Sequence, residues 1–170
     1  FGASGGIGTA LVQQLRGNKR FVEVLDFARS GERTFDLADE DSIESAAAAI
    51  RALGIAPRVV INATGVLHAE GCIAEKSWGQ IDPASMLRAF TVNTIGPALL
   101  IKHILPLMPV SGRCVFATLS ARVGSIADNR LGGWYSYRSS KAALNQIVRT
   151  AAIELRRKRP NCVCVALHPG

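Results

Sequence analysis

The sequence predicts an α/β fold in which a doubly wound parallel β-sheet is covered by helices on both faces. Short, continuously apolar runs alternate with longer segments of helical periodicity along the chain. Such runs, without regular polar alternation, are typical of strands that are buried on both faces. Of the 170 residues, 48% are hydrophobic and 19% are charged. No repeat or linker divides them, so we expect one domain over residues 1–170.

The apolar runs are the expected strands, and the segments between them are the expected helices. We expect strands over residues 21–25, 58–62, 112–119 and 162–167, and a short extended piece over residues 33–36. We expect helices over residues 9–16, 41–53 and 83–107, and a fourth that carries Tyr137 and continues to Leu155. Asp41 or Ser42 can cap the second helix, and Pro160 ends the fourth. Looser segments cover residues 68–82 and 124–133.

Both ends of the chain look cut. The chain begins with Phe1 rather than Met, and it stops at Gly170 directly after a strand-like run. We therefore expect an interior segment of a longer protein, with a sheet truncated at both ends. A sheet without most of its first strand loses its middle, so we expect this piece not to fold stably alone.

The net charge of +7 is concentrated at the end of a helix. The densest basic run, residues 156–159, lies directly before Pro160, where the helix dipole favours cations. Aromatic residues make up 6% of the chain and are not interleaved with the basic ones, as stacking on bases would require. We expect no nucleic-acid partner. A basic surface can instead attract a phosphate-rich cofactor.

The apolar segments and the cysteines indicate a cytoplasmic protein. The stretch over residues 94–110 is broken by prolines, Lys102 and His103, so we expect no membrane span. The four cysteines, at positions 72, 114, 162 and 164, lack the spacing of metal ligands. We expect reduced structural thiols and no metal site.

A glycine-rich turn opens the chain and leads into the first helix. Gly2, Gly6 and Gly8 follow the spacing G-x-x-x-G-x-G, which differs from the common dinucleotide pattern G-x-G-x-x-G. Glycine lets the turn tighten and lets a pyrophosphate approach the N–H groups of a helix N-terminus. We expect a dinucleotide to contact this turn, including Ser4 and Ile7 between the glycines.

The end of the second expected strand indicates which dinucleotide binds. A basic residue there accommodates the 2′-phosphate of NADP, whereas an acidic one favours the free 2′-hydroxyl of NAD. Arg29 is nearest the loop, and Ser30 can add a hydroxyl contact, so we expect NADP; if Asp26 were the reader, NAD would be preferred. Asp36 and Leu37 follow where a carboxylate could meet the adenine amino group. Asp36 could equally be a turn or cap residue.

Tyr137 and Lys141 are four residues apart and project from one face of the expected fourth helix. A phenol has an ordinary pKa of about 10, which is too high for efficient proton exchange near neutrality. An ammonium one turn away stabilises the phenolate and lowers this pKa. A shift of about two units requires roughly 2.7 kcal/mol. The pair is a candidate proton donor with its activating charge.

The motifs in their order resemble the classical short-chain dehydrogenase/reductase (SDR) family. The resemblance rests on the Gly2–Gly8 turn, Asn62-Ala63-Thr64-Gly65, Asn93, Tyr137-x-x-x-Lys141 and Pro169-Gly170. Residues 120–126 and 132–135 are similar to the branch of C-factor-like proteins and sniffer-type carbonyl reductases. The resemblance covers the whole chain and implies a Rossmann-like fold, with a substrate-binding segment that would follow Gly170.

The resemblance also implies roles for single residues. Tyr137 would be the acid–base residue for hydride transfer between NADP(H) and a small carbonyl or alcohol substrate, and Lys141 would lower its pKa and bind the nicotinamide ribose. Asn93 would kink its helix and hold a proton-relay water, unless it bonds only to backbone. Asn62, Ala63 and Gly65 would line the adenosine side, and Pro169 and Gly170 would meet the nicotinamide. The family contains dimers, tetramers and monomers.

The catalytic serine is displaced from its usual position. Three residues before Gly124, where the family usually has serine, this chain has Ala121. The candidates are Ser120 and Ser125, either of which could orient a carbonyl and stabilise its developing charge. Strand alternation sends Ser120 to the side opposite Ala121. A non-catalytic dinucleotide-binding sensor or signalling protein is the alternative function, although such a protein need not keep the proton donor.

Overall fold

The computed structural model describes residues 1–68 and 73–170. Its strands are β1 (Val59–Asn62), β2 (Cys114–Leu119) and β3 (Cys162–Leu167). Its helices are α1 (Gly6–Arg16), α2 (Glu40–Ala52), α3 (Pro83–Phe90), α4 (Gly96–Ile104) and α5 (Tyr135–Lys158). Short 3₁₀ turns cover Trp78–Gln80, Leu105–Leu107 and Arg122–Gly124, and a π turn covers Thr91–Ile95.

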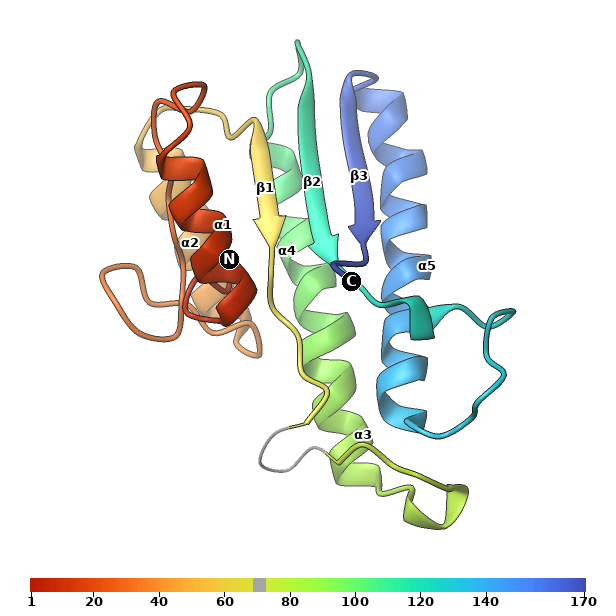
Figure 1. The fold of residues 1–170 in the computed structure, drawn as a ribbon. Coiled ribbons are helices and arrows are strands. Elements are labelled where there is room, and N and C mark those ends of the chain that lie inside the picture. The colour runs from red at the N-terminus through yellow and green to blue at the C-terminus, as the bar shows by residue number, and fades with distance from the viewer. Residues whose placement is uncertain (69–72) are drawn as a thin grey trace.

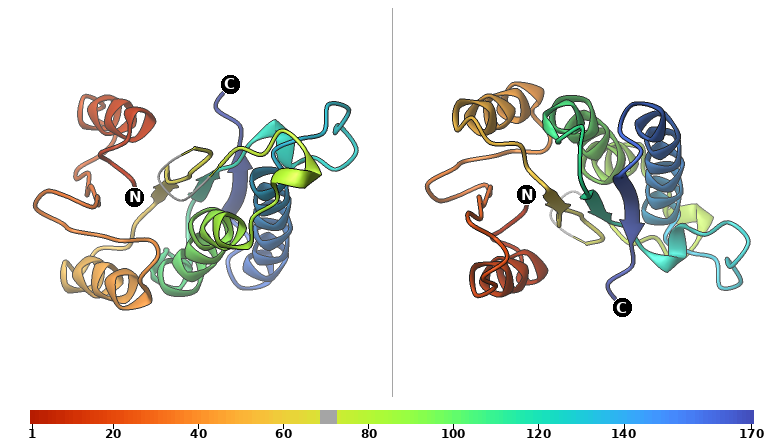
Figure 2. Two further views of the ribbon diagram at one scale, coloured as in Figure 1. Left: turned by 90° about the horizontal axis from the view of Figure 1, so that it is seen from below. Right: turned by 90° about the horizontal axis from the view of Figure 1, so that it is seen from above.

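The three strands form a parallel sheet in the order β1-β2-β3, which confirms the α/β fold class (Figure 1). Cys114 pairs with Cys162 and Val59 pairs with Val115, so the strands end together at one edge. Helices α2, α4 and α5 lie along one face of the sheet, and α1 lies on the other (Figure 2). The carboxyl ends of parallel strands are where ligands bind in sheets of this kind.

The strand predicted over residues 21–25 is wrong. Residues 21–27 run without a ladder, and the Val22 side chain is fully exposed. The extended piece over residues 33–36 contributes one bridge, between Ala28 and Thr34. The backbone of residues 1–3 lies between Phe27 and β1 and bonds to Phe27 and Ile61. The Phe1 amine donates to the Ile61 carbonyl at 2.9 Å, and Gly2 N–H donates to the Phe27 carbonyl at 2.9 Å.

A cavity of about 580 Å³ lies between α1, residues 20–27 and β1. Its walls include the side chains of Leu11, Leu15, Val24 and Val59. Phe1 and Phe27 also line it, and their rings are stacked with the centroids 4.8 Å apart.

The helix predicted over residues 83–107 is interrupted near its middle. Asp82 caps α3 by accepting from Ser85 N–H at 2.7 Å, and the π turn then separates α3 from α4. A π turn inserts an extra residue into the helical ladder and is frequent at functional sites. The cap of α2 also differs from the prediction, because Asp39 accepts from Asp41 N–H at 3.1 Å.

The main core lies between the sheet and helices α2, α4 and α5. Phe116, Leu100, Ile104 and Leu144 have no exposed surface there. The segment Pro83–Leu107 has a mean hydropathy of 1.2 and is long and apolar enough to cross a membrane. A core helix of a soluble protein meets the same criteria, and α4 contributes Leu100 and Ile104 to this core.

Three buried cysteines line the same core. Cys114, Cys162 and Cys164 are free thiols, and burial raises the pKa of Cys162 to about 12 and that of Cys164 to about 11. Thiols with such raised pKa values stay protonated and unreactive near neutrality. Cys72 lies outside the described residues.

Candidate active site

Tyr137 lies in the first turn of α5, and Lys141 lies one turn further along the same face. The Lys141 ammonium is 5.8 Å from the centre of the Tyr137 ring and donates to the Leu119 carbonyl at 2.9 Å. The lysine is 3% exposed, and burial lowers its pKa to about 8. The Lys141 ammonium therefore lies at the last residue of β2.

The pKa of Tyr137 does not follow the prediction in this structure. Partial burial of the phenol raises its pKa. The nearby ammonium lies beside the ring and bonds to a carbonyl, so it makes no hydrogen bond that would favour the phenolate. The expected lowering would need the ammonium to act on the hydroxyl more directly than it does here.

Asn93 is fully buried in the π turn and joins two parts of the site. Its Oδ1 accepts from Val66 N–H and its Nδ2 donates to the Val66 carbonyl, both at 2.8 Å. Nδ2 also donates to the Ser140 hydroxyl at 3.1 Å, and this hydroxyl donates to the Tyr137 carbonyl at 2.9 Å. The predicted helix kink at Asn93 is present as the π turn. The alternative, that Asn93 bonds only to backbone, is wrong because it also bonds Ser140.

The loop after β1 passes close to the Tyr137–Lys141 pair. Asn62 is buried, donates to the Thr118 hydroxyl at 3.0 Å and accepts from the Thr64 hydroxyl at 2.6 Å. A side chain at Gly65 would begin 3.3 Å from the Lys141 ammonium and 3.4 Å from Asn93 Oδ1. The loop therefore approaches the Lys141 side chain of α5 through a residue without a side chain.

The glycine-rich turn packs on the same loop and leaves a helix N-terminus open. Gly2 has a φ of +83°, and a Cβ there would lie 2.9 Å from the Thr64 methyl group. A Cβ on Gly8 would come within 2.1 Å of the Gly2 carbonyl oxygen, so this position excludes any side chain. Apart from its chain neighbours and the backbone of its own helix, no described atom lies within 4 Å of a Cβ on Gly6, where α1 begins without a side-chain cap. Ser4 and Ile7 are exposed beside it.

This open end of α1 suits an anionic group. The first N–H groups of a helix have no intrahelical partners and carry the positive end of the dipole. A pyrophosphate at Gly6 would fill the space that a side chain would otherwise occupy. The turn therefore fits the dinucleotide that the sequence predicts.

Some of the residues expected at the adenosine end are exposed, and others are already bonded to neighbouring protein groups. Arg29 and Ser30 are exposed on the bend that follows Phe27. The Asp26 carboxylate accepts from Arg16 at 2.8 Å and lies 3.9 Å from Arg33, so it is already paired with cations. Asp36 Oδ1 accepts from Ala38 N–H at 2.9 Å, which matches the alternative interpretation of this residue as a turn residue.

Leu37 is a core residue in this structure. Its side chain is 5% exposed and packs against α4, where a Cβ on Gly96 would come within 2.3 Å of Leu37 Cγ. A cofactor could meet Leu37 only through its main chain.

Neither candidate serine makes a hydrogen bond to Tyr137. Ser120 follows β2, is 8% exposed and donates to Asn145 Oδ1 at 2.7 Å. Asn145 lies two helical turns beyond Tyr137. Ser125 is exposed, and its hydroxyl accepts from Asp128 N–H at 3.3 Å. A cavity of about 280 Å³ beside Ser125 is lined by a different stripe of α5 that includes Tyr135 and Ser139.

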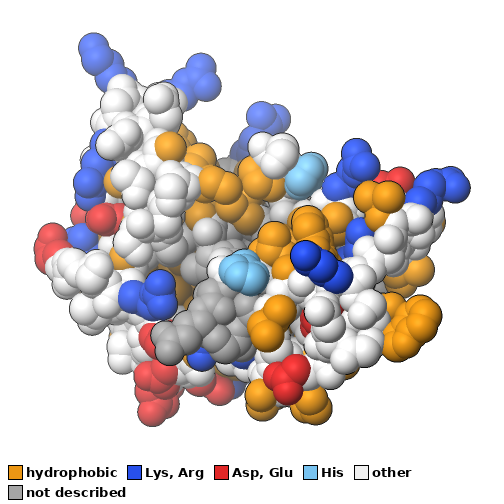
Figure 3. All heavy atoms as spheres, turned by 60° about the horizontal axis from the view of Figure 1, so that its bottom comes forward, with side chains coloured by type: hydrophobic (Ala, Val, Ile, Leu, Met, Phe, Trp, Pro, Cys, Tyr) orange, Lys and Arg blue, Asp and Glu red, His pale blue; other side chains and the backbone are white. Residues whose placement is uncertain are grey.

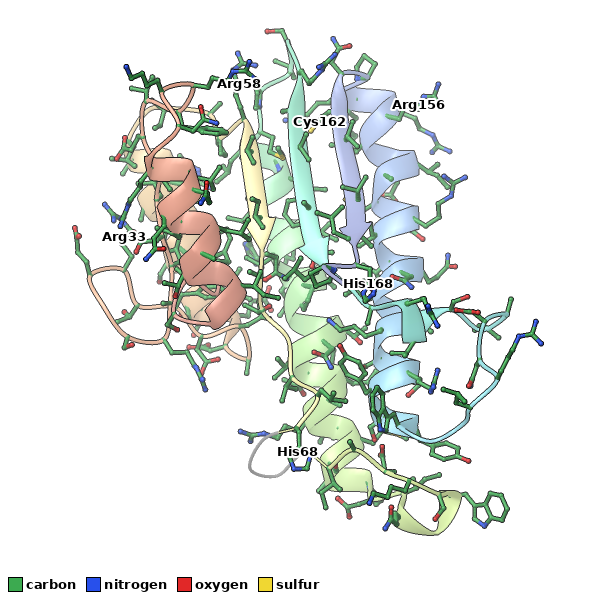
Figure 4. All side chains as sticks on the ribbon, viewed as in Figure 1. Arg33, Arg58, His68, Arg156, Cys162 and His168 are labelled. Atoms are coloured by element: carbon green, nitrogen blue, oxygen red, sulfur yellow. The ribbon has the colours of Figure 1, made fainter. Side chains whose placement is uncertain are left out.

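The last expected residues, Pro169 and Gly170, are exposed after β3. They follow His168, which lies at the carboxyl edge of the sheet, near the start of the chain segment that leaves β2 (Figure 4). Hydrophobic side chains gather near the histidines on this face of the molecule (Figure 3). The described elements thus bring the glycine-rich turn, the loop after β1 and Pro169 to the same edge as Tyr137.

Sequence reasoning missed the residues that hold the start of α5. Ser140 stands between the tyrosine and lysine, and it joins Asn93 to the Tyr137 backbone. Glu75 is fully buried and bonds Ser136 across 61 positions of sequence. One signal was available: the residue before Tyr135 is tryptophan, which is not a helix-capping residue, so the helix needed a distant partner.

Comparisons with known proteins agree with these motifs. A family model described as enoyl-(acyl carrier protein) reductase matches residues 2–169. The C-signal protein of Myxococcus xanthus is 42% identical over 92 residues, which cover 54% of this chain and 54% of that protein. A 1-hydroxy-2-glutathionyl-2-methyl-3-butene dehydrogenase of Rhodococcus sp. is 31% identical over 178 residues, which cover 99% of this chain and 74% of that protein. The chain thus matches about half the length of C-signal and three quarters of the dehydrogenase.

Solved structures show the same fold. The carbonyl reductase Sniffer of D. melanogaster aligns with a TM-score of 0.84 at 26% identity, covering 99% of this chain and 78% of that one. An NADPH-bound carbonyl reductase from chicken fatty liver aligns with a TM-score of 0.79 at 29% identity, covering 99% and 77%. The predicted similarity to C-factor-like and sniffer-type proteins is confirmed. With its fold and its ordered motifs, this chain belongs to the short-chain dehydrogenase/reductase family of oxidoreductases.

Proposed function

We propose that the protein is an NADP-preferring reductase of small carbonyl compounds, or a dehydrogenase of the corresponding alcohols, in the cytoplasm. The observation that carries this proposal is the Tyr137–Lys141 pair, whose ammonium lies 5.8 Å from the phenol ring at the carboxyl edge of the sheet. Tyr137 would give a proton to the carbonyl oxygen during reduction and take it back during oxidation. The similarity to carbonyl reductases supports this substrate class.

The proposed cofactor site runs from the open end of α1 to the turn after β3. Backbone N–H groups at Gly6 and Ile7 would hold the pyrophosphate. Arg29 and Ser30 would hold a 2′-phosphate, while the loop of Asn62, Ala63 and Gly65 would line the adenosine side. NADPH, when bound, would supply the hydride. The exposure of Arg29 and the pairing of Asp26 with Arg16 support NADP over NAD.

Lys141 would act on the charge that develops when Tyr137 loses its proton. The ammonium is present below its pKa of about 8, so it is charged at neutral pH. An ammonium near a phenolate favours the charged form, so this attraction would lessen the cost of removing the Tyr137 proton. This attraction would oppose the effect of burial, which raises the Tyr137 pKa. Lys141 would also bind the nicotinamide ribose, and Asn93 would keep the loop at Val66 beside the pair.

The test is NADPH oxidation by the full-length protein with a panel of aldehydes, ketones and an enoyl thioester. Tyr137→Phe keeps the ring and removes the proton donor, so we expect turnover of a carbonyl by the wild type and its near loss in this variant. Turnover of the enoyl thioester alone would contradict the carbonyl assignment. Preference for NADH would contradict the assignment of Arg29.

A second candidate function is a non-catalytic dinucleotide-dependent sensor or signalling protein. The similarity to C-signal favours it. This function predicts tight cofactor binding with no turnover of any carbonyl. Tyr137→Phe should then change neither the binding nor the absence of turnover. The same panel therefore separates the two functions.

A further inference from the structure

Helix α5 begins without a capping side chain of its own. Trp134 occupies the N-cap position with φ of 52° and ψ of 46°, in the left-handed region that bulky residues rarely adopt. Its side chain makes no cap hydrogen bond. The first N–H groups of a helix need partners from elsewhere, and here the first turn carries Tyr137. The start of α5 is therefore both unusual in conformation and close to the proposed chemistry.

Glu75 supplies the missing partner. Its side chain is fully buried, and its carboxyl oxygens accept from Ser136 N–H at 3.2 and 3.3 Å. The Ser136 hydroxyl donates to the same carboxyl group. The Glu75 main-chain oxygen accepts from Trp134 N–H, and a Cβ on Gly133 would lie 3.2 Å from that oxygen. One residue thus holds the segment from Gly133 to Ser136, directly before Tyr137.

The segment that carries Glu75 is anchored on both sides. Ile73 N–H donates at 2.9 Å to the hydroxyl of Ser85, a buried residue of α3. Lys76 N–H donates at 2.8 Å to Gln80 Oε1. Because Glu75 is fixed to α3 in this way, its contacts set the position of the α5 first turn relative to the π turn that holds Asn93.

Trp134 connects this arrangement to the proton donor. Its ring meets the Tyr137 ring edge-on, with centroids 6.3 Å apart and planes at 74°. The left-handed backbone that Glu75 holds directs the tryptophan toward the tyrosine. Release of the first turn would free both rings together.

We propose that Glu75 is a positioning residue for Tyr137, acting as a remote cap of α5 that fixes the phenol and the neighbouring indole. Glu75 does not touch the reacting atoms. The proposal rests on the proposed role of Tyr137, and it adds a residue outside the motifs of the family. It differs from a purely structural cap in predicting loss of turnover with cofactor binding retained.

The test compares Glu75→Ala and Glu75→Gln in the full-length protein. Glu154→Ala is the matched control, because Glu154 is an exposed glutamate of α5. We expect Glu75→Ala to lower kcat roughly ten- to a hundredfold, the range that small misplacements of a catalytic group produce. The KM for NADPH should stay within about twofold. Glu75→Gln keeps an acceptor oxygen and should recover most of kcat. Glu154→Ala should match the wild type.

Hydrogen exchange gives a readout that does not need activity. Amides of the first turn of α5 should exchange faster in Glu75→Ala, while those around Glu154 should not change. Ser136→Ala removes only the hydroxyl bond and should show a smaller change in the same direction, so it serves if Glu75→Ala does not fold.

The outcomes separate the two proposals. An unchanged kcat or unchanged exchange of the first turn in Glu75→Ala would overturn the positioning role. An equal loss of NADPH binding and kcat would also overturn it, in favour of general destabilisation. If the wild type turns over no carbonyl, the proposed function fails, and the exchange data alone decide whether Glu75 holds the first turn.

Discussion

Replacing Lys141 with methionine removes a buried positive charge while keeping an unbranched side chain. In the folded protein burial lowers the pKa of Lys141 from 10.5 to about 8, whereas the unfolded chain keeps the ordinary value. Between these two values the unfolded chain holds a proton that the folded protein has lost. The free energy of unfolding must therefore rise with pH from about 8 to about 10.5 through this group.

The size of this rise follows from the shift. A lowering by about 2.5 units corresponds to about 3 kcal/mol, because each unit is about 1.4 kcal/mol. Below pH 8 the buried ammonium destabilises the fold by that amount relative to a neutral amine. The residue is 3% exposed, so solvent screens the effect little.

Urea unfolding of the cofactor-free, full-length protein at pH 7 and pH 10 measures the effect. Methionine does not titrate, so the difference between wild type and Lys141→Met isolates the lysine from other titrating groups. We expect the wild type to gain about 2 to 3 kcal/mol relative to the variant between the two pH values. A difference that does not change with pH would refute the burial argument.

Three further predictions concern the cofactor turn, its specificity and the serine. Gly8→Ala should abolish dinucleotide binding and destabilise the fold, because its Cβ would meet the turn's own backbone. Gly6→Ala should keep the fold and weaken NADPH binding at least tenfold, as a titration monitored by NADPH fluorescence would show. Arg29→Ala should weaken NADPH binding about tenfold, by the loss of a charge-assisted contact, and leave NADH binding unchanged in the same titration; an equal loss for both would contradict its assignment. Ser120→Ala should leave kcat within about threefold because its hydroxyl is bonded away from Tyr137, whereas Ala121→Ser should raise kcat, as steady-state kinetics would show.

The fold was largely predictable because its strands are marked by local apolar runs. The run over residues 162–167 is β3 itself, and the runs over residues 58–62 and 112–119 contain β1 and β2 with one or two extra residues. The segment over residues 21–25 has a similar apolar character but forms no ladder with any of the described residues. A strand depends on its neighbour, which composition alone does not reveal.

Helical periodicity found the long helices and missed what divides them. The π turn at Thr91–Ile95 is short and lies inside an apolar segment, so helical periodicity over residues 83–107 did not reveal it. The motif Tyr137-x-x-x-Lys141 was visible because its partners are one turn apart. The raised pKa of Tyr137 was not visible, because it depends on burial.

Long-range contacts account for the remaining differences at the site. The bond from Ser120 to Asn145 spans 25 positions, and that from Glu75 to Ser136 spans 61. A sequence motif records residue types at fixed spacing and carries no information on such pairs. The choice between Ser120 and Ser125 therefore depends on the partners of their hydroxyl groups, which only the structure gives.

The most direct test of the central claim is the rate of NADPH oxidation with a responsive aldehyde or ketone by the full-length wild type and by Tyr137→Phe. We expect carbonyl-dependent turnover in the wild type and a drop of at least a hundredfold in the variant, with NADPH binding retained. Equal turnover by the two proteins would contradict the assignment of Tyr137 as the proton donor.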